Sequence, residues 1–440
     1  MNARKRIVLA TFGSYGDIHP YMAIATELRS RGHHPVIATS ELYREKMLAG
    51  GFDFVPVRPH IPPPQEQDAV MMEKVMNPKS GSGYILNEML FPFVREGYED
   101  LLRAVEGADL LLTHPISFAG PLVAQKTGIA WVSSVLAPAS FMSAYDPPVP
   151  PFWPWMRHVQ LLGPRFVAAF FKQVKKYYKN KSYDEFREEL GLPDRGSPVF
   201  EGQHSPTLIL ALFSALFAQP QPDWPPQARV TGFAFYDGRN ELAMPPELTK
   251  FLDEGPPPIV FTLGSSAVWV ARDFYRESIA AAKQLGRRAV LLIGDARNQL
   301  KEPLPPEIIA VNYAPFDSLL GRACVMVHHG GAGTTSQALR AGIPALIVPF
   351  AFDQPDNAAH AARLGGSRTL PRPKYRAARV AKELDILLTK PEHASKAYET
   401  GKLLRSENGA AVTGDLIEQV LQRGEGLMAP GSRGTRLCCL

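Results

Sequence analysis

The clearest chemical pattern in the chain is the string Val327-His-His-Gly-Gly-Ala-Gly-Thr-Thr-Ser-Gln337. Its glycines carry no side chains, so backbone N–H groups can approach an anion closely. Its threonines can cap a following helix and bind a phosphate oxygen, and the helix N-terminus adds partial positive charge. Its two histidines add donors that can become cationic. The string predicts a diphosphate site, although a tight strand-to-helix turn with idle histidines would show the same pattern.

Two further groups of residues suit a nucleotide sugar. Asp353 and Gln354 follow an apolar run, and a carboxylate beside an amide can bind sugar hydroxyls. Tyr313 stands before a proline-shaped turn, where its ring could stack on a base. Each residue alone could equally be structural, as a capping Asp or a packed Tyr.

A candidate general base lies near the start of the chain, in Phe12-Gly-Ser-Tyr-Gly-Asp-Ile-His-Pro20. Asp17 follows the first apolar run and precedes a helical pattern. From its surroundings alone, Asp17 would be assigned as a helix-capping residue. Glycosyl transfer with inversion would need such a carboxylate to deprotonate the acceptor hydroxyl.

In these motifs the chain resembles the GT-B nucleotide-sugar glycosyltransferases of the UDP-glucuronosyl/UDP-glucosyl transferase type. The histidine-glycine turn precedes the Asp-Gln pair by the family's spacing, with His329 standing 24 positions before Asp353. The resemblance implies an inverting hexosyltransferase with a UDP- or dTDP-sugar as co-substrate. It implies diphosphate-binding residues His328, His329, Gly331, Gly333, Thr334, Thr335, Ser265 and Ser266; base and ribose contacts at Tyr313 and Gln337; and sugar contacts at Asp353 and Gln354.

The resemblance also assigns the catalytic residues. Plant members carry a catalytic His where this chain has Asp17, whereas several bacterial antibiotic, sterol and rhamnolipid transferases carry Asp. Plant members orient that His with an Asp at the end of a later strand, and here that strand ends in His114. A swapped pair, with Asp17 as base and His114 beside it, is therefore our hypothesis; the alternative is a strand-end histidine bound to backbone.

We expect no metal cofactor. No Asp-x-Asp pair occurs in the chain, and GT-A enzymes use that pair to hold Mn²⁺ or Mg²⁺ against the diphosphate. The helix N-terminus and the histidines would take the place of the metal, so EDTA should not abolish activity.

The acceptor pocket is expected in the N-terminal half, in a loop rich in aromatic residues and proline. Large rigid apolar side chains there suit an apolar small molecule or a lipid. The candidate acceptor residues are Phe141, Tyr145, Phe152 and Trp153. The following stretch, Arg157–Lys181, is basic and amphipathic. It predicts either a solvated helix over the core or a peripheral contact with the inner face of a membrane.

Two other functions remain open at this stage. One is a nucleotide-sugar epimerase on the same fold, which would need extra carboxylates around the anomeric carbon. The other is a non-catalytic nucleotide-sugar-binding protein in which Asp17 only caps a helix. Asp17→Asn should spare donor binding and abolish transfer in an enzyme, and change little in a binding protein.

Alternating apolar strands and helical patterns must position these residues, which predicts an α/β chain with two doubly wound, Rossmann-like domains of the GT-B kind facing a cleft. The expected strands are 6–11, 35–39, 53–57, 108–113, 130–135, 258–263, 289–293, 324–327 and 344–348, with helices at 18–31, 273–285, 336–340 and 415–423. We expect an acceptor domain over 1–218, a proline-rich linker over 219–250, a donor domain over 251–426, and a disordered tail over 427–440.

Composition excludes several other classes of protein. Hydrophobic residues make up 45% and charged residues 21% of the 440 positions, as in ordinary globular proteins. A net charge of +5 does not by itself indicate nucleic-acid binding. Three cysteines exclude a disulfide framework and fit a cytoplasmic setting. No apolar stretch reaches the ~18 residues of a membrane span.

Overall fold

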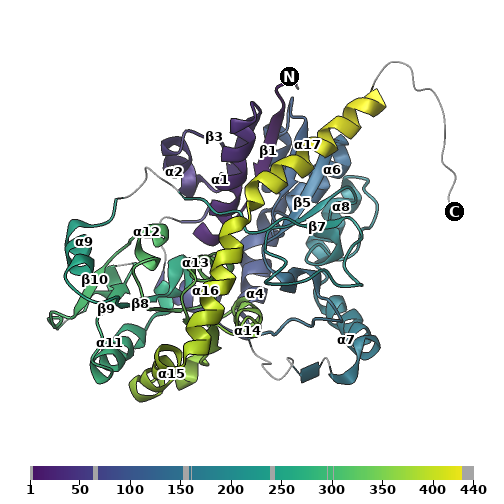
Figure 1. Ribbon diagram of the computed structural model, residues 1–440. Coiled ribbons are helices and arrows are strands. Elements are labelled where there is room, and N and C mark those ends of the chain that lie inside the picture. The colour runs from purple at the N-terminus through teal and green to yellow at the C-terminus, as the bar shows by residue number, and fades with distance from the viewer. Residues whose placement is uncertain are drawn as a thin grey trace.

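The computed structural model describes residues 3–62, 68–151, 158–159, 161–237, 243–294, 296–300 and 302–428. In this part of the chain, two parallel sheets are each covered on both faces by helices (Figure 1). The α/β, doubly wound architecture predicted from the alternating strand and helix patterns is confirmed.

The N-terminal sheet has the strand order β3-β2-β1-β4-β5-β6-β7. Its strands are β1 (Arg6–Ala10), β2 (His34–Thr39), β3 (Asp53–Pro56), β4 (Leu110–Thr113), β5 (Ala130–Val135), β6 (Ile209–Ala211) and β7 (Ala228–Val230). The helices of this half are α1 (Tyr15–Ser30), α2 (Arg44–Ala49), α3 (Ala69–Val75), α4 (Gly81–Tyr84), α5 (Val94–Ala104), α6 (Ala119–Thr127), α7 (Pro164–Tyr177) and α8 (Lys181–Glu189). A π-helix covers Ile85–Leu90.

The C-terminal sheet has the order β10-β9-β8-β11-β12-β13. Its strands are β8 (Ile259–Thr262), β9 (Ala289–Leu292), β10 (Ile308–Val311), β11 (Val325–His328), β12 (Ala345–Ile347) and β13 (Ser367–Thr369). The helices are α9 (Pro246–Asp253), α10 (Gly264–Ala267), α11 (Phe274–Gln284), α12 (Phe316–Leu320), α13 (Ala332–Ala341), α14 (Gln354–Arg363), α15 (Ala377–Thr389), α16 (Pro391–Ser406) and α17 (Gly409–Met428).

Strand side chains alternate between two apolar layers in each domain, as a sheet buried on both faces requires. Ile7 and Leu9 enter one core cluster, whereas Val8 enters the cluster on the opposite face. The same alternation separates Phe261 from Val260 in the second sheet. These continuous apolar runs are the reason that the strands could be recognised from the sequence.

The two domains share buried surface. Val75 and Met76, at the end of α3, are buried within the core of the C-terminal domain. Ile209 and Phe213, on and after β6, lie in one cluster with residues of the second sheet such as Val260. The two domains are therefore in direct contact, and apolar side chains of both are buried in shared clusters.

The expected linker over 219–250 is too wide. β7 lies inside it and pairs with β6 in the N-terminal sheet, so that domain extends beyond residue 218. α9 begins at Pro246, also inside the expected linker. β7 escaped prediction because it is an edge strand of three residues, none of them buried.

Two helices are longer than their patterns suggested. α13 begins at Ala332, so Gly333 and Thr334 lie in its first turn instead of preceding it. α17 extends through Met428, into the segment expected to be disordered; residues 429–440, with Cys438 and Cys439, lie outside the described residues. α16 and α17 form the yellow band that crosses from the C-terminal to the N-terminal domain in Figure 1.

Candidate active site

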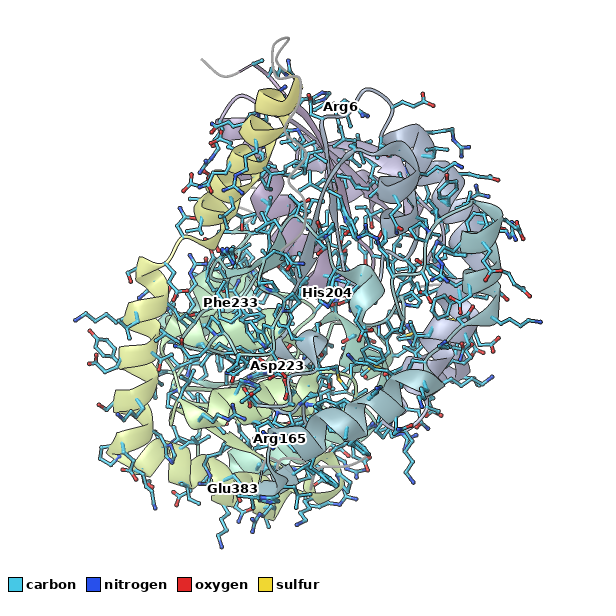
Figure 2. All side chains as sticks on the ribbon, turned by 90° about the vertical axis from the view of Figure 1, so that its right-hand side faces the viewer. Arg6, Arg165, His204, Asp223, Phe233 and Glu383 are labelled. Carbon is cyan, nitrogen blue, oxygen red and sulfur yellow. The ribbon has the colours of Figure 1, made fainter. Side chains whose placement is uncertain are left out.

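The polar residues singled out in the sequence follow the strands next to the point where the strand order of each sheet changes direction. In the N-terminal sheet β1 lies between β2 and β4; in the C-terminal sheet β8 lies between β9 and β11. Asp17 follows β1 and His114 follows β4, whereas Ser265 follows β8 and His329 follows β11. Ligands of doubly wound proteins bind at such switch points, beyond the carboxyl ends of the strands. Arg6, at the opposite end of β1, is labelled at the top of the molecule in Figure 2.

Asp17 occupies the third position of α1 and closes its first turn. One carboxylate oxygen, Oδ2, accepts hydrogen bonds from the Ser14 backbone N–H at 2.8 Å and from the Ser14 hydroxyl at 3.2 Å. A side chain at Gly13, which has φ of +129°, would collide with this carboxylate. The capping role suggested by the sequence is thus present, and it fixes the carboxylate's orientation.

The other oxygen of Asp17 faces His114. Asp17 Oδ1 lies 3.3 Å from His114 Nε2, and the His114 side chain is only 5% exposed whereas that of Asp17 is 33% exposed. His114 Nδ1 accepts the Ile116 backbone N–H at 3.3 Å, so a neutral ring carries its proton on Nε2. The structure therefore brings together the two side chains of the predicted pair, with His114 as the donor and Asp17 as the acceptor.

The histidines of the glycine-rich turn are neutral. Burial lowers the pKa of His328 to about 3 and that of His329 to about 4. The expectation that they become cationic is therefore wrong, because both rings are sealed in the domain. His328 Nδ1 accepts the Gly330 N–H at 3.1 Å, which leaves its proton on Nε2. His328 Nε2, His329 Nδ1 and the Thr335 hydroxyl are buried with no hydrogen-bond partner.

Glycine at position 264 makes room for His329. A Cβ at Gly264 would lie 2.5 Å from His329 Cε1, and its φ of +61° also favours glycine. This contact brings the turn after β8 against the turn after β11. Ser265, which is exposed, and Ser266, which is half-buried, follow Gly264 in α10.

Asp353 and Gln354 lie at the start of α14, and they differ in availability. Gln354 Oε1 accepts the Phe350 and Ala351 backbone N–H groups at 2.8 and 3.0 Å. Its oxygen thus shapes the loop, contrary to the expectation that it would accept from a sugar. Asp353 is half-buried and accepts one hydrogen bond, from Asn357 Nδ2 at 2.8 Å.

Asn357 is a site residue that the sequence analysis missed. Its amide also donates to the Gly330 carbonyl at 3.0 Å, so it joins α14 to the glycine-rich turn. The only sequence signal was its position four residues after Asp353, on the same face of a helix.

The two domains meet where the two sets of residues face one another. A Cβ at Gly333 would lie 3.4 Å from Gly16 Cα, so the N-termini of α13 and α1 are in near contact. Burial raises the pKa of Asp353 to about 6, the bond from Asn357 opposes the rise, and the negative charge of Asp17 adds to it. The candidate base thus lies within electrostatic reach of the candidate sugar-binding carboxylate.

Other predicted residues divide between the site and the core. Tyr313 is 52% exposed after β10, and Gln337 is half-buried on α13. Phe141 is half-buried: its ring stacks on Trp224, with the ring centroids 4.1 Å apart, and packs against the core. Tyr145 is 49% exposed. Phe152 and Trp153 lie outside the described residues.

Within the described ranges, no three His, Cys, Asp or Glu side chains are grouped so as to hold a metal ion.

Comparisons with known proteins agree with this geometry. Residues 276–418 match the family described as erythromycin biosynthesis protein CIII-like, C-terminal domain. Over 97% of its length the chain is 29% identical to the whole O-mycaminosyltylonolide 6-deoxyallosyltransferase of Streptomyces fradiae. The chain is a GT-B glycosyltransferase.

Solved structures share the fold of this glycosyltransferase over nearly its whole length. The glycotransferase of kitacinnamycin is 22% identical, with a TM-score of 0.70 over 96% of this chain and all of that one. The glycosyltransferase VinC, in complex with dTDP, gives 20% identity and a TM-score of 0.65 over 95% of this chain and all of that one. The sterol 3-beta-glucosyltransferase of Leptosphaeria maculans is 28% identical over 96% of the chain, which spans only 29% of that longer protein.

Proposed function

We propose that this glycosyltransferase moves a hexose from a UDP- or dTDP-sugar to a hydroxyl of an apolar small molecule or lipid, with inversion and without a metal. Asp17 is the general base. The observation that carries the proposal is the Asp17–His114 pair, which faces the N-terminus of α13 and its buried, unpartnered donors.

In the proposed step, the acceptor oxygen attacks the anomeric carbon while Asp17 takes the hydroxyl proton. The bond from that carbon to the diphosphate breaks, and its electron pair leaves with the diphosphate. The His114 Nε2–H stabilises the carboxylate in the orientation needed to receive the proton. The charge growing on the leaving group is met by the backbone N–H groups at the N-terminus of α13, which the helix holds in place.

The substrates are proposed by chemistry and likeness. VinC was solved in complex with dTDP, and the names of the two relatives specify O-mycaminosyltylonolide and a sterol as acceptors.

Calorimetry with UDP, dTDP, UDP-glucose and dTDP-rhamnose, each with and without EDTA, tests the donor. We expect one nucleotide to bind equally well in both conditions. Thr335→Val, which removes a buried unpartnered hydroxyl, should weaken that binding. Thr413→Val is the matched control, because Thr413 on α17 is equally buried and unpartnered but lies away from the cleft. Equal loss in both variants, or no binding at all, would overturn the donor assignment.

α7 is proposed to contact an anionic membrane surface. Leu161, Leu162 and Phe166 are 81%, 60% and 55% exposed, whereas Val167 and Phe171 anchor the helix to a small core cluster. No Asp or Glu occurs between positions 158 and 183, and the exposed Lys and Arg residues in this range are Arg165, Lys172, Lys176, Lys179 and Lys181. Arg165 marks this helix in Figure 2. No helix in the described part of the chain has the length and apolar content of a membrane span.

Vesicle flotation distinguishes the two interpretations of α7. Binding to vesicles with anionic lipid, lost in the double variant Leu162→Ser/Phe166→Ser, supports membrane contact through the combined apolar and basic surface. Recovery of the protein in the unbound fraction with every vesicle composition would identify α7 as a solvated helix.

A further inference from the structure

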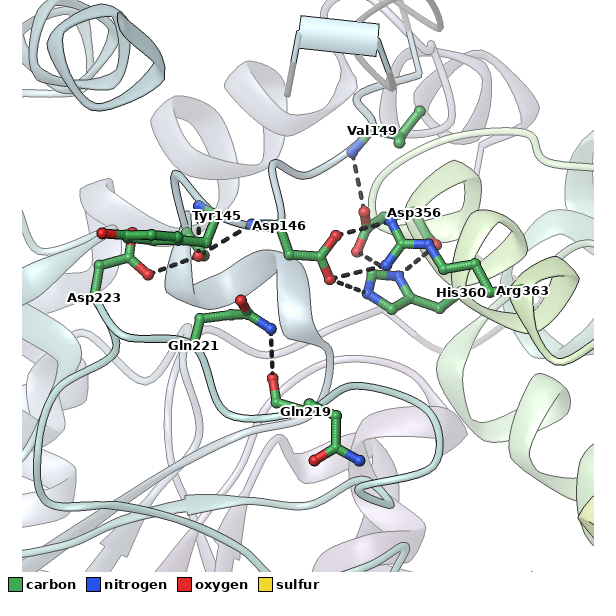
Figure 3. A network of polar contacts seen from close by, with 10 residues as sticks. Tyr145, Asp146, Val149, Gln219, Gln221, Asp223, Asp356, His360 and Arg363 are labelled. Atoms are coloured by element: carbon green, nitrogen blue, oxygen red, sulfur yellow. Dashed lines mark hydrogen bonds and ion pairs between the residues drawn. The ribbon is translucent and has the colours of Figure 1, made fainter. Parts of the chain in front are cut away.

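The loop that follows β5 crosses from the N-terminal to the C-terminal domain. At its centre Asp146 contacts α14, the helix whose first residues include Asp353 (Figure 3). This loop therefore connects the domain expected to hold the acceptor with the helix that begins beside Asp353.

Asp146 binds two cationic side chains of α14 at once. Its Oδ2 lies 2.9 Å from His360 Nε2 and 3.0 Å from one Arg363 nitrogen, and its Oδ1 lies 2.8 Å from the other. The carboxylate side chain is 16% exposed and the His360 side chain 2% exposed. A planar fork on a shielded carboxylate is a directional contact, unlike a solvent-exposed ion pair.

The hydrogen bonds of His360 require a protonated ring. Nε2 faces the Asp146 carboxylate, and Nδ1 faces the Asp356 carbonyl at 3.0 Å. Both partners are acceptors, and a neutral imidazole has only one N–H to donate. Burial opposes the charge, but the bond to Asp146 and the nearby Asp356 carboxylate outweigh it and raise the pKa of His360.

The loop itself is held from both sides. The Ser143 hydroxyl donates to Asp223 at 2.6 Å and accepts the Asp146 backbone N–H at 3.3 Å. Three residues after Asp146, the Val149 N–H donates to Asp356 on α14 at 3.0 Å. Figure 3 shows these contacts as one network from Asp223, through Asp146, to His360 and Arg363.

α14 transmits this contact to the sugar-binding end of the cleft. His360 lies seven residues after Asp353, about 10 Å along the helix. Asn357, between them, ties the same helix to the glycine-rich turn. A loop that is fixed to His360 and Arg363 is thereby fixed relative to Asp353 and the donor site.

We propose that Asp146 is a positioning residue for sugar transfer: by binding His360 and Arg363 together, it fixes the loop after β5 to α14 and so sets the acceptor against the donor. This role rests on the proposed function. It concerns the alignment of two bound substrates and not the binding of the donor, because no diphosphate-binding residue belongs to the network.

The contact has a defined pH range. The groups that face His360 are Asp146 from the loop, Asp356 and Arg363 from its own helix, and the ring of Phe217, 5.3 Å away. Since the pKa of His360 is raised, its contribution to the stability of this contact is complete below about pH 6.5. That contribution is lost as the pH rises through the raised pKa. The pKa of Asp146 is lowered, so its contribution is complete above about pH 4 and is lost in stronger acid.

The test compares Asp146→Asn with Asp146→Glu in the full chain. We expect Asp146→Asn to lower kcat for transfer by ten- to a hundredfold, with the dissociation constant for the free nucleoside diphosphate unchanged. The alkaline limb of its kcat profile should move to lower pH, because His360 loses its anionic partner. Asp146→Glu, which keeps the charge, should recover part of the rate. Deuterium exchange of residues 143–151 should accelerate in Asp146→Asn.

Glu383→Gln is the matched control. Glu383, labelled in Figure 2, is a 4% exposed carboxylate bound by Arg368 and Arg379. All three residues lie in the C-terminal domain, Arg368 on β13 and the other two on α15. This variant should keep kcat and the exchange rate of residues 143–151. An unchanged kcat and pH profile in an active Asp146→Asn enzyme would overturn the positioning role alone. Absence of transfer by the unaltered protein would overturn the proposed function, and the positioning role with it.

Discussion

Asp17 performs two tasks with its two oxygens. Oδ2 closes the first turn of α1 through Ser14, and Oδ1 faces His114. The first task fixes the orientation that the second requires, so the capping role is compatible with the proposed role as general base. The assignments as cap and as base were therefore never exclusive alternatives.

His114→Ala should lower kcat by about 10- to 100-fold, because Asp17 loses the donor that orients it. His114→Gln offers an amide donor to the same Asp17 oxygen, Oδ1, and should therefore lower kcat less than His114→Ala does. Initial rates at saturating donor and acceptor measure the effect, with melting temperatures as the control for folding. Turnover equal to that of the unaltered enzyme in His114→Ala would show that the pair is structural.

The affinity for the donor sugar should depend on Asp353. With a pKa raised to about 6 by burial and by the charge of Asp17, Asp353 becomes protonated as pH falls below 6 and then accepts sugar hydroxyls poorly. The KM for the nucleotide sugar should therefore rise in acid between pH 7 and 5. The profile for Asp353→Asn should be flat in this range; a slope identical to that of the unaltered enzyme would assign the titration to another group.

The family resemblance singled out Asp17, His114 and the histidine-glycine turn, and the strand pattern indicated their place in the fold, because each follows a recognisable strand. The directions of the pKa shifts were not predictable: burial lowers the pKa of His328 and of His329, whereas the bond to Asp146 raises the pKa of His360 despite its burial. The contact between Asp146 and His360 could not be predicted from the sequence either, because the two residues are 214 positions apart.

At the scale of the elements, α14 joins three parts of the active site. Its first turn carries Asp353, its middle holds the Gly330 turn through Asn357, and its end binds the loop after β5 through His360 and Arg363. Gln354 shapes the preceding loop through backbone contacts. The single helix α14 therefore contacts both the glycine-rich turn and the loop after β5 from the other domain.

Asn357→Ala should release the glycine-rich turn from α14. The loss of two buried hydrogen bonds, to Gly330 and Asp353, should lower the free energy of unfolding by about 1–3 kcal/mol. The KM for the donor should rise by more than the KM for the acceptor. Urea unfolding and steady-state kinetics measure the two effects. A loss of stability with both KM values intact would leave Asn357 as a folding residue only.

Most strands of four to six residues were predictable to within one or two residues, because most of them are buried apolar runs bounded by glycine, proline or charged residues; the three-residue strand β6 is buried too but was too short to be recognised. The edge strand β7 was not, since three half-exposed residues carry no such pattern. The early start of α13 was missed for the opposite reason. Its glycines indicate a loop by propensity, yet they begin a helix whose N-terminus faces the cleft.

At the scale of the whole molecule, α17 returns from the C-terminal domain and packs on α1 (Figure 1). Arg31, at the end of α1, binds Asp415 at 2.6 Å, Glu418 at 3.1 Å and the Ala411 carbonyl at 2.9 Å. Gly414 permits this approach, because a Cβ there would lie 2.8 Å from the guanidinium. This closing helix of the C-terminal half thus packs against the N-terminal domain.

Arg31→Met should lower the free energy of unfolding by about 1–3 kcal/mol, because the 18% exposed guanidinium makes several charge-assisted hydrogen bonds. Lys250→Met is the control. It removes a 75% exposed lysine that lies 3.8 Å from Glu254, and such pairs contribute about 0–1 kcal/mol. Equal midpoints for the two variants in urea would contradict a stabilising role for the α1–α17 contact.

The central claim is that Asp17 removes the acceptor proton during sugar transfer. The most direct measurement is single-turnover transfer by Asp17→Asn and by the unaltered enzyme. It would use the nucleotide sugar that binds most tightly and a hydroxylated apolar acceptor, in EDTA. We predict that the variant binds the donor as tightly as the unaltered enzyme and transfers about 10²- to 10⁴-fold more slowly. Transfer by Asp17→Asn at the unaltered rate would contradict the account.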